Sequence, residues 1–532
     1  MPRVIKGITI PVNRAEGDLE IKIDMTDGVI TDAWSSGTMY RGFETMMTGR
    51  GALDGLVITP RVCGICSLTH LSAAVNALDI ISESTPPDNA IRLRNLSLMA
   101  ETIQSDMRQS ILMFMADFTN SQAYQHHFLF EEATKKYQPL KGTSVMDVVK
   151  KTRRLIEIIA IIGGQWPHTS FMVPGGVTSI PDTPKLMQCR LIVEQFRNWY
   201  ESRVLGCSIE RWQDISNLAD LYEWLDEKPE HSKSDVGFFL RFAFKAGLDT
   251  FGTATENYIS FGNLPFPAET TISEILKKSK TDLYDNHTPQ SRSLISAGFA
   301  KGTTLFPLEP EKIREDISSS WFKPSSSAAH PFEGETIPYA SGNSSQRYSW
   351  VKAPRYDNLP SETGPLAEMI IDGEPLFHDM IKNKGATTLT RQLARMVRPA
   401  KLLPAMTIWL NELMHRRNEP FYTSVKNIPD GQGAGMLQAA RGALGHWVKT
   451  ENQKIAQYQI ITPTSWNASP RDSGTVRGPW ETALIGTSVK SIENPVEAGH
   501  VIRSFDPCMV CAVHTLRKNS NNCNQQKNSF II

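Results

Sequence analysis

The chain has 532 residues, of which 40% are hydrophobic and 21% are charged, proportions typical of a soluble globular protein. Its formal net charge is +0, so electrostatics do not indicate binding to nucleic acid or to a membrane surface. No apolar run approaches about 18 residues, the length that a transmembrane helix needs, and the start, MPRVIKGITI, lacks the layout of a signal peptide. We therefore expect a cytoplasmic protein, held peripherally on the cytoplasmic side of a membrane only if a partner binds it there.

The first predicted elements are strands. Residues 8–34 alternate apolar and polar side chains around Asp27-Gly28, which is a hairpin turn signal. From residue 60 onward the pattern changes to helical spacing, first in residues 66–82 and then in residues 88–119. In the second segment the apolar residues recur at intervals of three and four: Leu93, Leu96, Met99, Ala100, Ile103 and Met107.

Long amphipathic helices continue through the middle of the chain. Gly163-Gly164 ends a helix over residues 143–164, residues 185–206 continue the pattern, and helices return at residues 389–416. Residues 318–346 are rich in Ser, Pro and Gly, which indicates a long surface excursion or a loop packed against a partner. Because there is no internal repeat and no clear linker, we expect one large α+β unit, mainly α with β excursions. It would have long central helices and an N-terminal β-hairpin region.

The seven cysteines form no disulfide framework in a chain of this length. Cys189 and Cys207 are expected to be small buried apolar residues, and Cys523 is a further isolated thiol. The other cysteines form two Cys-x-x-Cys pairs, and a histidine follows each pair: Cys63, Cys66 and His70 near the start, and Cys508, Cys511 and His514 near the end.

Paired thiolates are soft ligands that select zinc, copper(I), iron in iron–sulfur clusters, or nickel in a sulfur-rich site. A thioredoxin-like redox pair is one alternative, but neither pair follows a βαβ pattern. A structural zinc site is another, although its two pairs usually lie about 15–20 residues apart, whereas residues 67–507 separate these pairs. If the four sulfurs bind one centre, the two ends of the chain must meet in the core.

The sequence around these pairs contains further motifs in a fixed order: RGFETMMTGR, TPRVCGICSLTH, PGGV, APRY, E-x-GPLA, ARGALGHW, TSWNASPRD and DPCMVCAVH. Together they resemble the large, catalytic subunit of nickel–iron hydrogenases, from about residue 7 to His514. The segment GGQWPHTSFMVPGGV is similar to the uptake hydrogenases of cyanobacterial type. The resemblance implies a single catalytic unit over residues 1–514.

In the family that the chain resembles, four cysteines hold nickel, and two of them also bridge to an iron that carries CO and CN ligands. The resemblance makes Cys63 and Cys508 terminal nickel ligands, and Cys66 and Cys511 the bridging ligands. Because dihydrogen is nonpolar it must be split heterolytically, and Cys508 is by analogy the nearest base. Glu16, in NRAEGD, matches the glutamate that relays the proton outward; the alternative for this residue by itself is a carboxylate on the hairpin surface.

Other matched residues would surround the metals. Arg441 matches the arginine that orients one cyanide, through a charge-assisted contact, and Thr464 matches the hydroxyl residue that bonds the other. Asp506 would pair with Arg441 in the interior, and His70 would donate a hydrogen bond to a bridging sulfur. By themselves Arg441, Thr464 and His70 could be a surface cation, a helix cap and an ordinary core histidine.

Glu44 and His514 resemble ligands of a separate magnesium (or iron) site near the C-terminus, with water completing the coordination. The chain departs from the family pattern in two places. Asp106 and Arg108 stand where many relatives have histidine, and Ala440 replaces a proline. Neither change involves a metal ligand, but both could alter gas access, oxygen sensitivity or proton traffic.

The polar tail, residues 515–532, has a composition unsuited to a core. In relatives a maturation endopeptidase removes such an extension after nickel-insertion proteins have loaded the metal. No cysteines remain for electron-carrying clusters, so the resemblance implies an iron–sulfur small subunit as the partner in a heterodimer that oxidises dihydrogen. A hydrogen-sensing regulatory hydrogenase is the alternative. A non-catalytic relative, like the respiratory complex I subunit, is disfavoured because all four cysteines are present.

Overall fold

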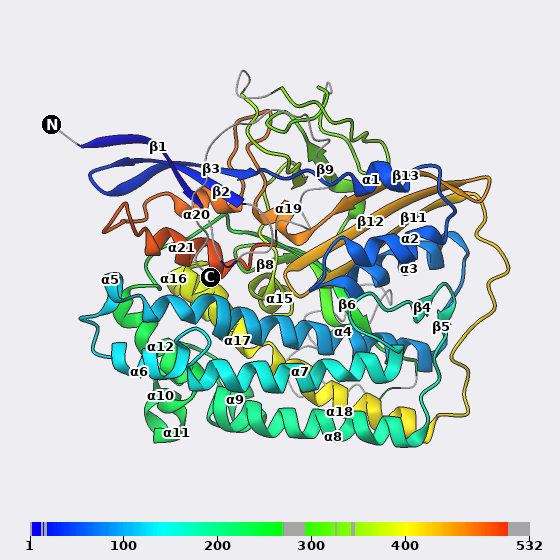
Figure 1. Cartoon of the computed structure of the whole chain (residues 1–532), viewed down its shortest axis with the longest axis horizontal. Coiled ribbons are helices and arrows are strands. Elements are labelled where there is room, and N and C mark those ends of the chain that lie inside the picture. Colours follow the sequence, from blue (N-terminus) through cyan, green and yellow to red (C-terminus); the bar gives the residue numbers. More distant parts are fainter. Residues whose placement is uncertain are drawn as a thin grey trace, which may run out of the picture.

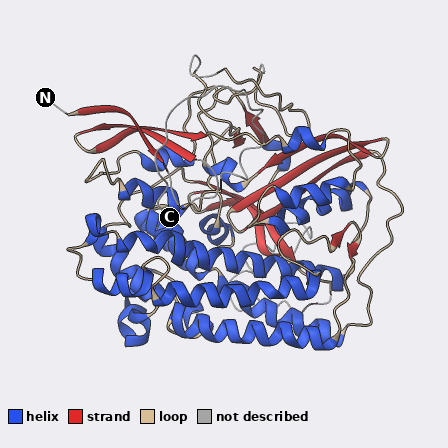
Figure 2. Cartoon of the chain, in the orientation of Figure 1, coloured by secondary structure: helices blue, strands red, loops and turns tan. Residues whose placement is uncertain are grey.

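The computed structural model describes residues 3–11, 14, 19–268, 270, 293–324, 327–341 and 346–508. Within these residues helices predominate, and the strands form small antiparallel sheets that lie mainly above the long helices in the view of Figure 2. The prediction of a mainly α protein with β excursions is therefore confirmed. Cys511, His514, Cys523 and Glu16 lie outside the described residues.

The α-helices are α1 Phe43–Met47, α2 Asp54–Ile58, α3 Ser67–Ile81, α4 Asp88–Arg108, α5 Ser121–Tyr124, α6 Phe130–Tyr137, α7 Thr143–Gly163, α8 Thr183–Trp199, α9 Ile209–Gln213, α10 Leu218–Glu227, α11 Pro229–Lys233, α12 Asp235–Ala246, α15 Pro365–Ile371, α16 Pro375–Lys384, α17 Thr388–Val397, α18 Pro399–His415, α19 Pro463–Asn467, α20 Pro479–Leu484 and α21 Val496–Ser504. Short 3₁₀ segments cover Thr59–Arg61, Met115–Thr119 and Pro310–Lys312, and π-helical turns cover Gln109–Phe114 and Tyr200–Leu205.

The strands are β1 Val4–Pro11, β2 Leu19–Thr26, β3 Val29–Gly37, β4 Met172–Val173, β5 Gly176–Val177, β6 Asn257–Pro265, β7 Ser293–Lys301, β8 Thr304–Phe306, β9 Ile313–Asp316, β10 Ala353–Tyr356, β11 Gly431–Ala439, β12 Gly442–Glu451 and β13 Lys454–Ile461. They pair in the orders β1-β2-β3, β4-β5, β6-β7-β8, β10-β9 and β11-β12-β13, and every pairing is antiparallel.

Four long helices, α4, α7, α8 and α18, form the helical layer in the lower half of Figure 1. Helix α7 is amphipathic and ends where Gly164 adopts a positive φ of 83°, as the sequence predicts. The apolar residues of α4 predict a helix that is buried along one stripe. In the structure nearly its whole circumference is buried, including Arg94, Glu101 and Asp106. Polar residues on α4 therefore lie in the protein interior and need partners there.

The glycine-rich strand β11 and its neighbour β12 pack directly on α3 (Figure 1). A Cβ atom added at Gly435 would lie 1.8 Å from the carbonyl oxygen of Ala73, and one at Gly433 would lie 2.3 Å from that of Ala77. Only glycine permits this approach of strand to helix. The contact matters for the site, since α3 begins beside Cys66 and the β11–β12 turn carries Arg441.

The N-terminal hairpin is confirmed. Strands β2 and β3 meet at Asp27-Gly28, where both residues have positive φ, 50° and 80°, as a primed two-residue turn requires. Apolar residues of β2, including Ile21 and Ile23, pack with residues of α20 and α21 into a hydrophobic cluster of their own. The first and last parts of the described chain thereby lie side by side (Figure 1).

Glu481 on α20 joins this hairpin to the body of the protein. It is buried, and its Oε1 accepts hydrogen bonds from the Ser35 N–H at 2.9 Å and from the Tyr348 hydroxyl at 2.7 Å. Burial raises the pKa of Glu481 to about 7, against the lowering effect of those hydrogen bonds. The native carboxyl therefore holds a proton through a pH window in which the unfolded chain has lost it, from about 4.5 to 7.

We expect the Glu481→Gln variant to gain stability relative to the parent as the pH rises through that window. In the parent a raised acid pKa means that the native state binds more protons than the unfolded state, so stability falls with rising pH. The glutamine does not titrate, and the difference should reach about 1–3 kcal/mol by pH 8. Denaturant midpoints of both proteins from pH 5 to 8 measure it. The matched control is Glu20→Gln on the exposed face of β2, and a constant difference across the pH range would contradict the prediction.

The described part of residues 318–346 contains no helix or strand, only isolated bridges such as Phe322 with Pro338, which confirms the irregular excursion. Phe322 packs edge-on against Tyr40 and Trp350, which are stacked on each other.

Cys189 is fully buried as predicted, whereas Cys207 is only partly buried and accepts a hydrogen bond from Trp224 Nε1 at 3.3 Å.

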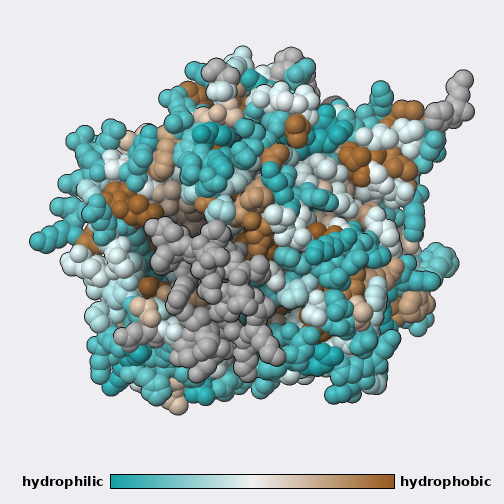
Figure 3. All heavy atoms as spheres, turned by 180° about the vertical axis from the view of Figure 1, so that it is seen from behind, coloured by the Kyte–Doolittle hydropathy of each residue, from teal (hydrophilic) through white to brown (hydrophobic). Residues whose placement is uncertain are grey.

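Outside the part drawn in grey, hydrophilic side chains cover most of the face seen in Figure 3, and hydrophobic ones form separate small groups among them. Exposed large apolar residues are scattered over several elements: Leu53, Val57, Phe128, Leu140, Ile180 and Met187 are examples. Among the described residues, none of the helices combines the length and the hydropathy that crossing a bilayer requires.

Candidate metal centre

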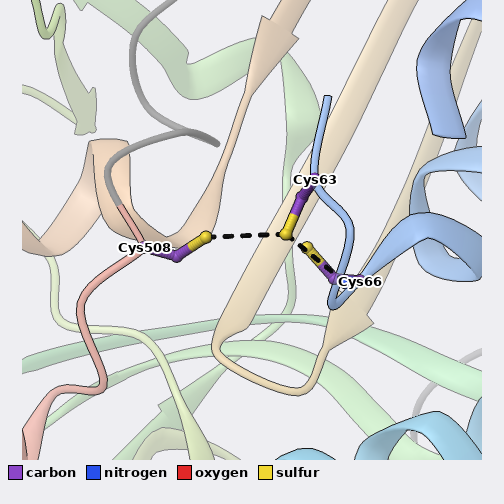
Figure 4. A group of neighbouring side chains, drawn as sticks. All are labelled: Cys63, Cys66 and Cys508. Carbon is purple, nitrogen blue, oxygen red and sulfur yellow. Dashed lines mark hydrogen bonds between the residues drawn. The ribbon is translucent and has the colours of Figure 1, made fainter. Parts of the chain in front are cut away.

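Three of the four predicted ligand sulfurs lie together in the interior. The Sγ atoms of Cys63, Cys66 and Cys508 are all within 4.8 Å of one another, and the side chains are 1%, 7% and 0% exposed. Cys63 and Cys66 flank a short loop before α3, and Cys508 points toward them from the segment that follows α21 (Figure 4). The fourth predicted ligand, Cys511, lies outside the described residues.

The spacing of the sulfurs fits a shared metal. The Cys63 and Cys508 sulfurs are 3.7 Å apart, far beyond the about 2.05 Å of a disulfide bond. Two thiolates bound at about 2.3 Å with a tetrahedral angle at the metal would lie about 3.8 Å apart. The donor set is also suitable, since several thiolates in one buried place bind a soft transition metal.

The backbone of the loop supports a thiolate at Cys63. Its Sγ accepts hydrogen bonds from the N–H groups of Ile65 at 3.3 Å and Cys66 at 3.4 Å. These donors stand at the start of α3, where the helix dipole also favours negative charge. Such an environment favours the deprotonated sulfur, which is the form that binds a metal.

A small recess adjoins the sulfurs, and its lining combines ligand, polar and apolar side chains: Cys66, His70, Ala439, Arg441, Leu444, Pro463 and Thr464. Four of the residues singled out from the sequence, Cys66, His70, Arg441 and Thr464, therefore face one space. Thr464 Oγ1 accepts the Cys508 N–H at 3.2 Å, which leaves its hydroxyl hydrogen available to donate.

Arg441 is the most important polar group of this lining. It stands in the two-residue turn between β11 and β12, and its Nε lies 3.2 Å from Asp506 Oδ2. The angle is not that of a hydrogen bond, and within the described residues Arg441 Nε and Nη1 and Asp506 Oδ2 have no hydrogen-bond partner. Burial by itself lowers the pKa of Arg441, but Asp506 and the neighbouring thiolates have the larger, opposite effect. The pKa of Arg441 is therefore raised, and the guanidinium stays charged. Buried donors without partners beside this recess fit a polar ligand there.

A network of buried charges lies next to Arg441. Arg398 donates to both oxygens of Asp106 at 2.8 and 2.6 Å, to Glu368 Oε1 at 2.6 Å and to the carbonyl of Ala440 at 2.6 Å. Burial raises the pKa of Asp106, and Arg398 opposes the shift. Of the residues at which the chain departs from the family pattern, Asp106 and the carbonyl of Ala440 are thus part of this network. Arg108 instead donates to Thr152 Oγ1 at 2.9 Å.

His70 belongs to a chain of aromatic hydrogen bonds. Its Nδ1 lies 3.0 Å from His446 Nε2, and His446 Nδ1 lies 2.8 Å from the hydroxyl of Tyr458. Burial lowers the pKa of His70 to about 4, so the ring is neutral. If the Tyr458 hydroxyl donates to His446 Nδ1, then His446 Nε2 carries a hydrogen and donates to His70 Nδ1. His70 then carries its own hydrogen on Nε2, the nitrogen left to donate to a sulfur.

Glu44 lies in a separate buried cluster. Its Oε1 accepts hydrogen bonds from Lys352 Nζ at 3.0 Å and from the Ile460 N–H at 2.9 Å. The same ammonium group donates to Glu315 Oε2 at 2.8 Å and to Gln459 Oε1 at 2.8 Å. Burial raises the pKa of Glu315 to about 7, against the lowering effect of Lys352. The cluster is rich in hard oxygen donors, but a lysine already neutralises part of its charge.

Comparison with known proteins decides the family. The family model for nickel-dependent hydrogenases matches residues 41–116 and 121–514. The chain belongs to the nickel-dependent hydrogenase family. It is a hydrogenase large subunit, and its family implies nickel and iron at the thiolate cluster and pairing with a small subunit.

Individual relatives agree with this assignment over nearly the whole chain. The hydrogenase is 29% identical to the periplasmic [NiFeSe] hydrogenase large subunit of Desulfomicrobium baculatum, with 95% of this chain and 94% of the relative covered. It is 26% identical to the uptake hydrogenase large subunit of Rhodobacter capsulatus, over 95% and 94% of the two chains. The solved Ni-Fe-Se hydrogenase of Desulfovibrio vulgaris Hildenborough superposes with a TM-score of 0.78 at 28% identity, covering 97% of this chain and 100% of that one.

Sequence reasoning missed several residues around the hydrogenase site. Arg398, Glu368 and His446 are buried beside it, yet none was predicted to take part. The signal was present in LTRQLARMVRP, where Arg391, Arg395 and Arg398 recur among apolar residues of a helical segment. Arginines interspersed with a core-facing stripe indicate buried carboxylate partners, which only the fold identifies.

Proposed function

We propose that this hydrogenase large subunit belongs to an uptake enzyme that oxidises dihydrogen at a nickel–iron centre held by Cys63, Cys66, Cys508 and Cys511. The observation that carries the proposal is the convergence of buried sulfurs from opposite ends of the chain, with Cys63 and Cys508 3.7 Å apart. Nickel, and iron carrying carbon monoxide and cyanide, would supply a redox-active centre at which the electrons of dihydrogen are accepted.

The chain's own residues would bind the group and handle the proton. The terminal thiolate of Cys508 would hold the proton, and Glu16 would relay it outward. The unpartnered Nε and Nη1 of Arg441 can donate to one cyanide, and the Thr464 hydroxyl, whose oxygen already accepts the Cys508 N–H, can donate to the other. Asp506 holds the arginine charge in place, and His70 Nε2 can donate to the bridging sulfur.

We further propose a magnesium (or iron) ion near Glu44 and His514. Oxygen atoms of Glu44, Glu315 and Gln459 surround the Lys352 ammonium group, and oxygen is the donor atom that magnesium prefers. Because Lys352 lies among them, the ion would be bound through water molecules with few direct protein ligands.

The electrons released from dihydrogen have to pass from the metal centre to another redox group. Within the described residues, Cys63, Cys66 and Cys508 form the one group of metal-ligating side chains close enough to share an ion. An iron–sulfur small subunit is therefore proposed to carry electrons away, and the heterodimer to act in the cytoplasm or peripherally on the cytoplasmic face of a membrane.

Metal analysis combined with infrared spectroscopy of the purified heterodimer tests the proposal. We expect nickel and iron in the large subunit, infrared bands of iron-bound carbonyl and cyanide, and dihydrogen oxidation with an artificial electron acceptor. Zinc in place of nickel, or the absence of those bands from active material, would refute it. A very slow turnover combined with a regulatory partner would identify a sensor instead.

The tail provides a separate prediction. We propose that residues 515–532 are removed by an endopeptidase after nickel-insertion proteins have acted, because a polar extension beside the last cysteine pair would keep the site open during loading. Intact-mass measurement of the active large subunit should then give a chain that ends at His514. A chain blocked in nickel insertion should keep Ile532, and active protein that still carries Ile532 would contradict the proposal.

A further inference from the structure

Glu101 on α4 is a buried carboxylate beside the first cysteine pair, and it is 1% exposed. Its Oε1 accepts hydrogen bonds from the Leu68 N–H at 3.0 Å and from Trp166 Nε1 at 3.3 Å. Its Oε2 accepts from the Thr69 N–H at 3.0 Å and the Thr69 hydroxyl at 2.7 Å. Both oxygens are thus fully used, and all but the tryptophan donor belong to the first turn of α3.

Helix α3 needs such an acceptor because of where it begins. The N-cap position of a helix usually carries Ser, Thr, Asp or Asn, whose side chain accepts the N–H groups of the first turn. In α3 that position is Cys66, and its side chain makes no capping hydrogen bond. The Cys66 sulfur lies in the thiolate cluster instead. Because the Cys66 side chain makes no capping hydrogen bond, the acceptor for the N–H groups of the first turn comes from elsewhere.

Glu101 also joins α3 to a third segment. Trp166, one of its donors, belongs to the loop after α7, and two residues later His168 contacts the same region. The His168 N–H donates to Ser67 Oγ at 3.2 Å, and His168 Nδ1 lies 3.0 Å from the Pro60 carbonyl. The carboxylate therefore connects α4, the start of α3 and the loop that packs against the Cys63–Cys66 segment.

The described residues show no ion pair at Glu101, in contrast to Asp106 and Glu368, which share Arg398. A buried carboxylate without a cation is costly, and here only oriented donors compensate it. The α3 dipole, whose positive end faces the carboxylate, adds to their effect. Such an arrangement fixes the first turn of α3 closely, because any displacement breaks several hydrogen bonds at once.

We propose that Glu101 is a positioning residue of the metal centre: it caps α3 in place of Cys66, and so holds the Cys66 thiolate in the geometry that binds the metals. This inference rests on the proposed function. It assigns Glu101 no contact with substrate or metal.

The test compares Glu101→Ala, which removes the cap, with Glu101→Gln, which keeps one acceptor oxygen but turns an N–H₂ group toward a backbone N–H. The control is Asp235→Asn, since Asp235 is also a buried carboxylate at a helix start and accepts the Tyr137 and Ser144 hydroxyls at 2.6 and 2.8 Å. It belongs to α12, which lies well away from α3 in Figure 1. Each variant is produced as the heterodimer, and nickel per folded large subunit, the infrared band of the iron carbonyl and dihydrogen oxidation are measured.

Replacing a residue that orients a metal ligand typically lowers metal affinity or activity about 10- to 100-fold. We expect Glu101→Ala to lower nickel content at limiting nickel at least about tenfold, and Glu101→Gln to retain more nickel but with a displaced carbonyl band. Asp235→Asn should lower the melting temperature while leaving nickel content and the band at their parental values.

Full nickel content with a parental carbonyl band in Glu101→Gln would overturn the inference, even if Glu101→Ala does not fold. The same loss of nickel in Asp235→Asn would also overturn it, because the effect would then be general destabilisation. A parent heterodimer without nickel or carbonyl bands would refute the proposed function itself, so the two failures are distinguishable.

Discussion

Replacing Cys63 by serine should abolish both nickel retention and dihydrogen oxidation. The Cys63 sulfur accepts two backbone N–H groups and lies 3.7 Å from the Cys508 sulfur, so no other side chain can take its place without moving the α3 start. A serine hydroxyl is a hard ligand that stays protonated near neutral pH, whereas nickel in such a site requires soft thiolates. Cys508→Ser should have the same effect and should also remove the base.

Nickel content by plasma mass spectrometry and dye-linked hydrogen oxidation, both per folded heterodimer, measure the loss. The matched control is Cys189→Ser, which places the same hydroxyl in the fully buried core of α8. That change should cost about 1–3 kcal/mol of stability and leave nickel content and specific activity unchanged. Parental hydrogen oxidation in Cys63→Ser would contradict the assignment of the centre.

Replacing Arg398 by methionine should produce the largest loss of stability. Its guanidinium donates to both Asp106 and Glu368 and also to the Ala440 carbonyl next to Arg441. Methionine leaves two carboxylates buried without that partner, and breaking a buried pair in this way costs about 3–5 kcal/mol. The turn that carries Arg441 loses a contact as well, so activity should fall in the variant that remains folded.

The loss should depend on pH. Burial raises the pKa of Asp106 and of Glu368, and Arg398 opposes the rise in both. Without the arginine, the pKa values of the two native carboxyls lie still further above those of the unfolded chain. The variant should therefore regain stability as the pH falls from about 8 to 5. Denaturant midpoints at several pH values measure this. A deficit that stays the same at every pH would contradict the account.

Arg92→Met provides the control for Arg398→Met. Arg92 is equally buried and pairs with Glu412 across the interface of α4 and α18, at 2.7 Å. Because Glu412 is partly exposed, water can solvate it once the arginine is gone, and the loss should be smaller. A loss as large as that of Arg398→Met would show that volume rather than charge determines the effect.

Local pattern predicts the regular elements well because each depends on near neighbours. The Asp27-Gly28 turn, α3, α7 and the irregular excursion all lie where alternation, helical spacing or composition places them. The strands β11 and β12 were not predicted, since their glycines and buried polar residues lack alternation. Their register follows from the contact with α3, which a single segment does not contain.

The sequence by itself determined the family, the two cysteine pairs and the residue types around them, because ordered motifs and soft ligands are properties of the chain. The fold alone decided which charges meet: Asp106, Glu368 and Arg398 become one network, and Glu101 accepts the N–H groups of the α3 start, which the Cys66 side chain does not cap. The physical reason is burial. A polar side chain on a helix looks solvent-facing until neighbouring helices exclude the water, and then its partner comes from whichever distant segment packs against it.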